Sequence, residues 1–380
     1  MTLETALFYV CVVLSLGASL VGFLALGDLV QLAVSFPRRF TYAVFRVRFL
    51  LIGLGGAAFV AALGLGIARR TWSGWGVWAL ALYALLFAVP FFAGYVAPTY
   101  LLFRTRRHGA KFVPVAALDG LLPGDAEALV VEVDGDARAY PHDWITRPHV
   151  VGDRVGGREV VMTYCALSHL GTAYDGSARQ LDLKVMTQLE NNLVLFDADT
   201  QEQIQQICNR TVGDGKPLPA IPSTVMPLAS FRALYPQGKV FYNPPGGAFD
   251  RQVRGMMFGL LRKQLDPANP LPVFPTIHHA DPRVPAKEQV YGIELDGRAV
   301  AYTLGYLDRQ GGTVCETLGG TEITVKHFPQ HGFVDVFYGR VPEVDPHGFA
   351  GGVRQRRVPH ANKVLWLIWA NFYRATEARV

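Results

Sequence analysis

Three long stretches without charged residues open the chain, over 6–26, 49–68 and 75–97. Each has about 20 residues or more, and a helix that rises ~1.5 Å per residue needs about 20 of them to cross a ~30 Å hydrocarbon core. Buried helices of a soluble protein would carry a polar stripe, which these stretches lack. The pattern therefore predicts a transmembrane region over 1–100 that contains three helices.

From residue 101 onward the pattern changes to short runs in which apolar and polar residues alternate between Gly and Pro. The run 129–140 predicts two strands joined by an Asp-Gly turn, and the run 154–164 predicts a second hairpin with a Gly-Gly turn. The sequence thus predicts a mainly β (α+β) soluble domain over 101–380.

Both hairpins recur later in the chain. Tyr302 follows Tyr140 by 162 residues, and the Gly-Gly pair of the second hairpin recurs after 163. A nearly constant offset with the same turn residues is typical of an internal duplication. We therefore expect related units of β-hairpins at about 129–176 and 290–339.

The rest of the soluble domain gives weaker signals. The segment 188–274 is rich in loop-forming residues and predicts one amphipathic helix near 230–235. The apolar tail, 364–373, is too short to span a bilayer, so we expect it to be a buried final element.

Lys and Arg near the apolar stretches predict the orientation in the membrane. The first loop holds four arginines, the second holds Arg69 and Arg70, and the segment after the third stretch holds four Lys or Arg. With the amino terminus outside, eight of these charges lie inside, so the soluble domain of a multi-pass cell-membrane protein is expected in the cytoplasm. The net charge of +5 comes largely from these residues. The expected partner is therefore anionic membrane lipid and not nucleic acid.

The four cysteines are too few for a disulfide scaffold, and Cys11 lies in the first apolar stretch. Cys165, Cys208 and Cys315 remain in the soluble domain, an odd set that suits free or catalytic thiols. Cys165 ends a predicted strand, and its counterpart in the second unit is Phe328, so the fold alone does not require a thiol there. The structural alternative is a small buried side chain that packs as a hydrophobe.

Ser168 and His169 follow Cys165 closely. A serine three residues after a thiol at a strand end can donate to the thiolate and lower its pKa, and His169 can hold a proton or bind a metal. Cys208 and Cys315 are candidate resolving thiols. A c-type haem is disfavoured, because Ser168 stands where haem attachment needs a second cysteine.

A metal site of Cys and His residues is the alternative chemistry. His142 and His149, with Cys165 and His169, would form a soft site suited to copper, although their spacing matches no established zinc pattern. No phosphate-binding loop, Gly-x-Ser-x-Gly or His-Glu-x-x-His motif occurs. The sequence requires no cofactor.

The segment 156–165 reads Gly-Gly-Arg-Glu-Val-Val-Met-Thr-Tyr-Cys and is followed by Leu167. It resembles the signature of the domain-of-unknown-function family 3179, Gly-Gly-x-Pro-Val-x-Val-Thr-Tyr-Cys-Pro-Leu-Cys. The resemblance continues through most of the soluble domain, in the segments 137–141, 191–194, 205–206, 274–275, 281–288 and 366–373.

Two positions depart from the family pattern. Ser168 stands at the family's second Cys, and Pro148-His149 stands where a His-Glu pair is usual. Both features resemble a membrane-bound branch of the family, in which some relatives are selenoproteins with selenocysteine at the position of Cys165. The resemblance implies a redox nucleophile at Cys165 but no substrate. Soluble relatives resemble exported proteins, which implies a periplasmic or extracellular domain as the alternative location.

The leading hypothesis is a membrane-anchored thiol oxidoreductase. Cys165 attacks as a thiolate and passes through a sulfenic acid or a mixed disulfide, and a thiol reductant or a redox partner protein restores it. Cys165 is expected to be partly exposed in a cleft lined by residues 188–210. The expected supporting residues are Tyr164, Ser168, His169, Gln188, Asn191, Asn192, Gln206 and Cys208. The alternatives are the copper site, and a non-catalytic module whose cleft holds a lipid or a peptide.

Overall fold

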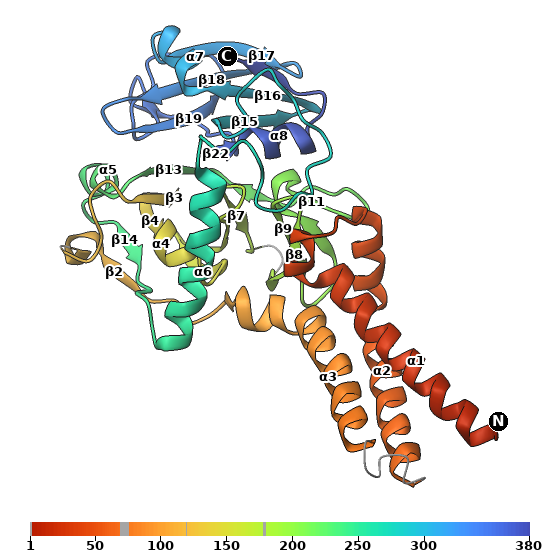
Figure 1. Cartoon of the computed structure of the whole chain (residues 1–380). Helices are drawn as coiled ribbons and strands as arrows, with labels where there is room; N and C mark the ends of the chain where they lie inside the picture. The colour runs from red at the N-terminus through yellow and green to blue at the C-terminus, as the bar shows by residue number, and fades with distance from the viewer. Residues whose placement is uncertain (1, 69–75, 119, 178–179) are drawn as a thin grey trace. The chain divides into compact units, whose positions relative to one another are not determined.

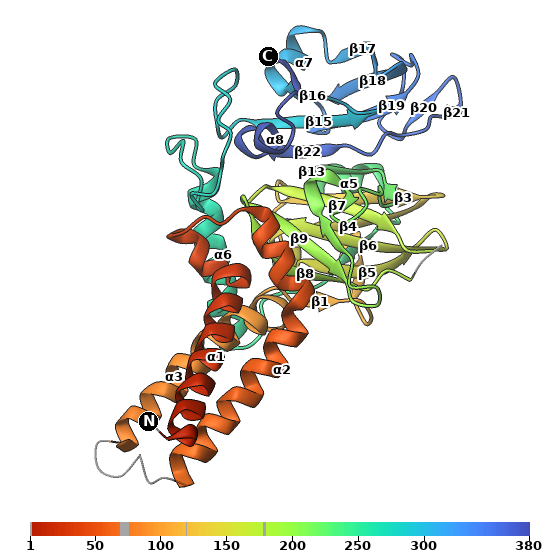
Figure 2. The ribbon, with the colours of Figure 1, turned by 90° about the vertical axis from the view of Figure 1, so that its right-hand side faces the viewer.

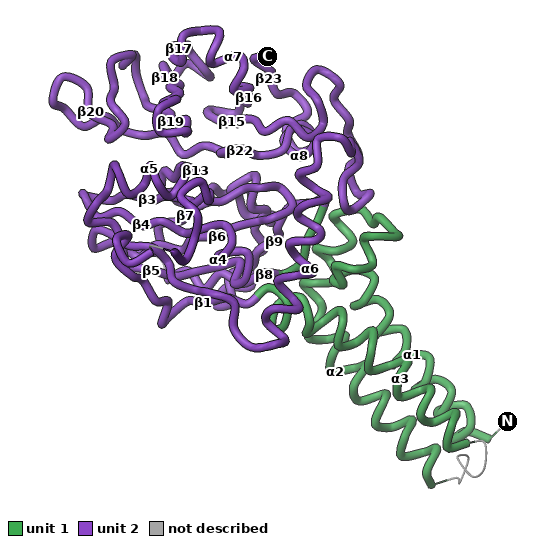
Figure 3. The backbone as a smooth tube through the Cα atoms, turned by 60° about the vertical axis from the view of Figure 1, so that its left-hand side comes forward, with its two compact units in different colours: residues 1–103, 186–189 green, residues 104–185, 190–380 purple. Residues whose placement is uncertain are grey.

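The computed structural model describes residues 2–68, 76–118, 120–177 and 180–380. Its chain divides into two compact units (Figure 3). Unit 1 contains residues 1–103 and 186–189, and unit 2 contains residues 104–185 and 190–380.

Unit 1 is built from three long helices, which Figure 1 shows in red to orange. They are α1 (Leu3–Leu26), α2 (Arg38–Ala68) and α3 (Gly76–Tyr95), with the short helical segments η1 (Asp28–Leu32) and η2 (Ala97–Leu102). All three long helices are long and apolar enough to cross a membrane, α2 over Arg48–Ala68. These spans agree closely with the predicted stretches, while Arg69, Arg70 and Trp75 lie outside the described residues.

Small residues let the helices of unit 1 approach closely. A Cβ atom added to Gly94 of α3 would lie 2.5 Å from the backbone carbon of Gly22 in α1, and one added to Gly22 would lie 2.2 Å from the Tyr95 ring, so both positions favour glycine. The Tyr95 hydroxyl donates to the Ala18 carbonyl at 2.9 Å. Helix α2 begins earlier than the predicted start at residue 49, because its Arg-rich first turns continue the helix beyond the apolar span.

Unit 2 is mostly β, and its strands form two series that we call the first and the second β unit. The first β unit contains β3 (Glu127–Val133), β4 (Asp136–Pro141), α4 (His142–Ile145), β5 (Val150–Val155), β6 (Arg158–Cys165) and β7 (Leu170–Asp175). The second contains β15 (Gln289–Leu295), β16 (Arg298–Thr303), α7 (Leu304–Arg309), β17 (Thr313–Leu318), β18 (Thr321–Phe328) and β19 (Phe333–Tyr338).

The turns within the two β units follow the expected chemistry. Asp134 and Gly135 between β3 and β4 have φ of 51° and 85°, which is the conformation of a type I′ hairpin turn. Asp296 and Gly297 between β15 and β16 have φ of 50° and 75°. The predicted hairpins at 129–140 and 154–164 are therefore confirmed.

Further strands and helices complete each β unit. The first also contains β13 (Ser223–Pro227), α5 (Leu228–Leu234) and β14 (Lys239–Phe241), and the second contains β22 (Ala361–Leu365), α8 (Trp366–Phe372) and β23 (Glu377–Arg379). Strands β13 and β22 pair antiparallel with β3 and β15, while β14 and β23 run parallel to β4 and β16. The predicted helix near 230–235 and the buried tail at 364–373 are both confirmed.

The sheets of each β unit enclose an apolar core. The first β unit uses the sheets β13-β3-β4-β14-β2 and β1-β5-β6-β7-β12, where β1 is Thr105–Arg106, β2 is Phe112–Pro114 and β12 is Ala220–Ile221. The second uses the sheets β22-β15-β16-β23 and β17-β18-β19. Side chains from both sheets of each β unit fill its core. Figure 2 shows β13 and β22 side by side where the two β units meet.

The prediction of a loop-rich segment over 188–274 is wrong. It contains β9 (Asn192–Asp197), β10 (Gln203–Gln205), β11 (Arg210–Thr211) and the 18-residue helix α6 (Ala248–Leu265), and β8 (Leu183–Leu189) reaches into it. Strand β9 is buried at every residue, so it lacks the polar–apolar alternation that identifies half-buried strands. Helix α6 contains two glycines, which weaken the helical pattern. The structure confirms N-terminal apolar helices followed by a mostly β region.

Candidate functional site

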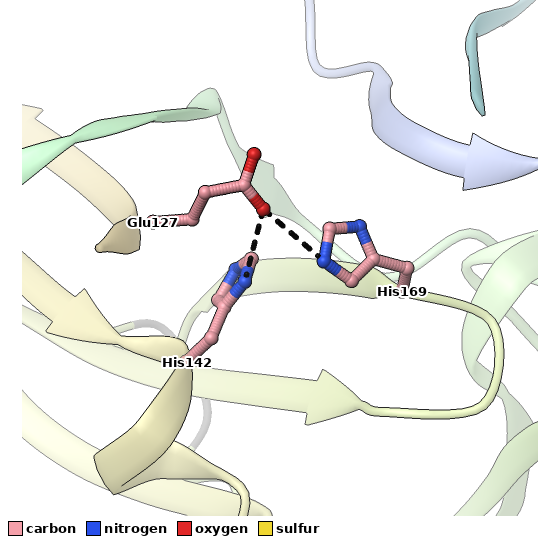
Figure 4. A group of neighbouring side chains, drawn as sticks. All are labelled: Glu127, His142 and His169. Carbon is pink, nitrogen blue, oxygen red and sulfur yellow. Dashed lines mark ion pairs between the residues drawn. The ribbon is translucent and has the colours of Figure 1, made fainter. Parts of the chain in front are cut away.

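Glu127, His142 and His169 come together in the first β unit (Figure 4). The Oε2 atom of Glu127 lies 3.6 Å from Nδ1 of His142 and 3.3 Å from Nε2 of His169. One possible ligand atom from each residue lies within 4.8 Å of the others. Three side chains from separate segments therefore converge on one point.

Backbone pairing brings two of these three residues together, and a turn of the facing sheet supplies the third. Glu127 is the first residue of β3 and His142 directly follows β4; the pairing of Ala128 with Pro141 places their neighbours side by side. His169 lies in the turn between β6 and β7, with a φ of 56°. The two imidazole rings meet edge to face with their centroids 4.8 Å apart.

The group lies at the edge of the protein interior. The side chains of His142 and His169 are 9% and 4% exposed, whereas that of Glu127 is 30% exposed. The carboxylate thus faces solvent on one side and the two imidazoles on the other.

The protonation states suit metal coordination. Burial lowers the pKa of His142 to about 4, despite the opposing effect of Glu127. Burial acts to raise the pKa of the Glu127 carboxyl, but hydrogen bonds from the two histidines and the nearby charge of Lys363 hold it well below its usual range. At neutral pH, Glu127 is therefore ionised and His142 is neutral.

Lys363 of β22 contacts two of the three residues. Its ammonium group forms an ion pair with Oε1 of Glu127, the oxygen that does not face the histidines. Its main-chain carbonyl lies 3.3 Å from Nδ1 of His169. This contact can hold the ring while Nε2 donates to Glu127, and an ion bound at Nε2 would replace the proton of that hydrogen bond.

Tyr164 lies against the same group of side chains. Its ring stacks on His142 with centroids 4.5 Å apart, and it meets His169 at 6.2 Å. The Tyr164 hydroxyl and Nε2 of His142 are buried polar atoms that have no hydrogen-bond partner among the described residues. Burial raises the pKa of Tyr164 well above its ordinary value, so the hydroxyl remains a donor.

The expected exposure of Cys165 is wrong. Its side chain is fully buried, and burial raises the pKa of the thiol. Hydrogen bonds from the Ser168 hydroxyl and from the amides of Ser168, Leu167 and Leu193 act in the opposite direction. The thiol therefore lies among donors that would stabilise a thiolate, but solvent does not reach it.

The predicted supporting residues near Cys165 form a buried network of side-chain amides. Asn192 donates to the Ser168 hydroxyl at 3.1 Å and to Gln206 at 3.2 Å, and Gln206 donates to Thr163 at 3.0 Å. Asn191 donates to the Phe274 carbonyl at 2.9 Å and accepts from the Phe274 amide at 3.1 Å. These contacts fix the loop that covers the thiol.

Other predicted residues lie elsewhere. Gln188 belongs to unit 1, where its amide donates to Asp28 at 2.7 Å. Cys208 is half-buried and lines a cavity of about 90 Å³ that residues 206–209 help to form, but Cys165 is not part of its lining. The sequence predicts a cleft that exposes Cys165 and is lined by residues 188–210. Part of this segment does line a cavity, but Cys165 does not. Cys315 is a half-buried residue of β17.

The predicted metal-binding residues are only partly brought together. His142 and His169 meet, whereas His149 and Cys165 are not members of the group that forms among the described residues. His149 is buried, and burial lowers its pKa to about 3. Sequence reasoning missed Glu127, which completes the group.

A comparison of the two β units in the sequence distinguishes Glu127, His142 and His169, because the second β unit has different residues at all three positions. At the matching offsets of 162 and 163, the residues are Gln289 for Glu127, Leu304 for His142 and Gly332 for His169. Gly332 has a φ of 64°, close to that of His169. The same turn is therefore formed in the second β unit by a glycine, which adopts this conformation without steric cost.

One comparison with known proteins gave a match. The model of the family described as "Protein of unknown function (DUF3179)" matches residues 108–376. No curated protein and no solved structure matches the chain.

Proposed function

The chain belongs to the domain-of-unknown-function family 3179, and we propose that it is a membrane-anchored metal-binding protein. Glu127, His142 and His169 would hold one divalent transition-metal ion. The observation that carries this proposal is the convergence of one carboxylate oxygen and two imidazole nitrogens within 4.8 Å of one another. These are donors that first-row divalent ions prefer.

The structural alternative is an ion-pair network that only stabilises the fold. Two observations favour binding. His169 has a φ of 56°, and the matching residue of the second β unit, Gly332, is a glycine. The first β unit therefore keeps an imidazole in a backbone conformation that disfavours a side chain. Gln289 and Leu304, at the positions that match Glu127 and His142, show that equivalent hairpins form without such a group.

The donor set favours a particular class of ion. Two imidazoles and one carboxylate suit Zn²⁺, Fe²⁺ or Cu²⁺, and three protein ligands leave further coordination positions for water or another ligand. A thiolate would be needed to favour the softer Cu⁺ ion, and Cys165 is not a member of the group. We therefore propose Zn²⁺ as the first ion to test.

The experiment is zinc binding by the full chain in lipid nanodiscs, measured by calorimetry and by metal analysis. We expect one Zn²⁺ per chain, and at least a tenfold weaker affinity in Glu127→Gln and His169→Gly. The matched control is His327→Ala, because His327 pairs with Asp308 at 2.7 Å in the second β unit and belongs to no cluster of three possible ligands among the described residues. Unchanged zinc affinity in both site variants would overturn the proposal.

A second candidate function is thiol redox chemistry at Cys165, through a sulfenic acid or a mixed disulfide. The observation in its favour is the set of four donors around the thiol, from Ser168, Leu167 and Leu193. We also propose that the chain belongs to the membrane-bound branch that it resembles, in which some relatives would carry selenocysteine at the position of Cys165. This function requires a movement that exposes Cys165.

The order of alkylation by iodoacetamide at neutral pH tests the thiol candidate. A redox thiol that opens readily should react before Cys208 and Cys315, which are half-buried. Burial of Cys165 in the resting protein predicts the reverse order. Slower labelling of Cys165 than of the other two would remove the support for thiol chemistry.

We further propose that α1, α2 and α3 all cross the cell membrane and that unit 2 faces the cytoplasm. Support comes from their length and composition and from the Lys and Arg that flank them. Anionic lipid is the expected partner of these charges. Labelling of a cysteine introduced near residue 380 by a membrane-impermeant reagent in intact cells would contradict this orientation.

The two β units are proposed to descend from an internal duplication. Their strands follow the same order, and Tyr140 donates to Asp153 as Tyr302 donates to Glu316, again at offsets of 162 and 163. An experimental structure in which the two β units superpose poorly when Tyr140 is placed on Tyr302 would contradict the duplication. The duplication explains how one β unit keeps the fold while the other acquires the site.

A further inference from the structure

We propose that the site binds an anionic oxygen ligand, a carboxylate or phosphate group, which bridges the metal ion and the ammonium group of Lys363. This inference rests on the proposed metal site at Glu127, His142 and His169. It adds a class of ligand and a specific role for Lys363, which no metal ligand set requires.

The first argument is the charge of the site. A divalent ion and the Lys363 ammonium together carry three positive charges, and Glu127 supplies one negative charge. The side chains of Lys363 and Glu127 are only 16% and 30% exposed, so water screens these charges incompletely. Partly buried charge of one sign is costly unless it is paired. An anion at an open coordination position of the ion would supply the missing charge.

The second argument is the backbone at Lys363. Strand β13 pairs with β3 in unbroken register, whereas the pairing of β22 with β15 shifts between Val290 and Gly292. Lys363 lies opposite this shift and has a φ of 51°, a conformation that lysine rarely adopts. Such β-bulges redirect side chains and are common beside functional sites. Here the bulge places a residue of the second β unit against Glu127 of the first.

The third argument is the way in which Lys363 contacts the carboxylate. Its ammonium group pairs with Oε1 of Glu127, and both histidines face Oε2. An ion bound at Oε2 would therefore leave Lys363 in place beside it. A carboxylate or phosphate group has two oxygens that can bind in this arrangement. One would bind the ion, and the other would accept a hydrogen bond from the Lys363 ammonium group. The unpartnered Tyr164 hydroxyl, on a ring stacked against His142, is a further buried donor at the same group.

The test uses the full chain in phosphatidylcholine nanodiscs loaded with Co²⁺, whose visible absorption spectrum reports its ligands. We expect acetate and phosphate each to shift the spectrum saturably in the wild type. In Lys363→Met, Co²⁺ should still bind, but the affinity for both anions should fall at least tenfold. Lys363→Gly suits the positive φ and provides a second variant should the methionine variant fold poorly.

The control variant is Lys326→Met in the second β unit, which should leave anion binding unchanged. A second arm replaces the soluble anions with nanodiscs that contain phosphatidylglycerol; a shift confined to that arm identifies a lipid phosphate as the source of the ligand. A Co²⁺-loaded protein whose spectrum responds to neither source, or equal anion affinity in the Lys363 variants, overturns this inference alone. A protein that binds no Co²⁺ overturns the metal proposal and this inference with it.

Discussion

His169 and Gly332 hold the same backbone conformation at matching corners of the two β units. Their φ angles are 56° and 64°, and each residue directly precedes the last strand of a three-stranded meander. In the left-handed region of φ and ψ, a residue with a Cβ atom is less stable than glycine by roughly 1 kcal/mol. The first β unit thus bears a local strain that the second avoids.

Replacement of His169 by Gly and by Ala separates this strain from the loss of the imidazole. Both variants remove the same ring contacts, but only His169→Ala keeps a Cβ atom at positive φ. We expect His169→Gly to be more stable than His169→Ala by about 1 kcal/mol in chemical denaturation. Neither variant should bind Zn²⁺ as the wild type does. Equal stability of the two variants would show that the turn is not strained.

Acid should destabilise unit 2 through His149. Burial lowers the pKa of His149 from 6.5 to about 3 in the folded protein. Between these values the unfolded chain binds a proton that the folded chain does not, so stability is complete above pH 6.5 and falls as the pH drops toward 3. Each pKa unit corresponds to about 1.4 kcal/mol.

Thermal unfolding of the wild type and of His149→Gln over this pH range measures the effect. The variant has no proton to gain and should show a shallower loss of melting temperature on acidification. The control is His347→Gln, because His347 is exposed and its replacement removes no buried side chain. An identical acid profile in the wild type and His149→Gln would contradict the assigned role of burial.

Asn191 should be required for stability and not for metal binding. Its side chain is fully buried and satisfies both the amide and the carbonyl of Phe274. In Asn191→Ala two buried backbone groups lose their partners, at a cost of about 2–4 kcal/mol. Asn269→Ala removes one exposed hydrogen bond and should cost under about 1 kcal/mol. Denaturant titrations measure both values, and similar small losses would contradict this role.

Local patterns in the sequence predict local structure well. The three long apolar helices follow from charge-free length, and the hairpins follow from Asp-Gly and Gly-Gly pairs that adopt positive φ. Strand β9 and helix α6 are not predicted, because their local patterns are weak. Every residue of β9 is buried, so it shows no alternation of polar and apolar residues, and Gly255 and Gly259 weaken the helical pattern of α6. Periodicity alone cannot distinguish such segments from loops.

The candidate site was harder to predict, because it is assembled from distant positions. Glu127, His142 and His169 are spread over about 40 residues, and Lys363 comes from the other β unit. No established spacing of metal ligands in a sequence connects a single Glu at the start of a strand with two histidines 15 and 42 residues later. The position of Cys165 at a strand end was predicted, but its burial depends on the loop that Asn191 and Asn192 fix from outside the motif. Aligning the two β units would have drawn attention to Glu127, since Gln289 replaces it.

X-ray absorption at the zinc edge of the zinc-loaded full chain tests the central claim most directly. The account predicts nitrogen and oxygen ligands at about 2.0–2.1 Å, with the multiple-scattering pattern of two imidazoles and no sulfur. The pattern of two imidazoles should be reduced to one in His169→Gly. A sulfur shell at about 2.3 Å would contradict the assignment, because it would place a cysteine and not Glu127 on the ion.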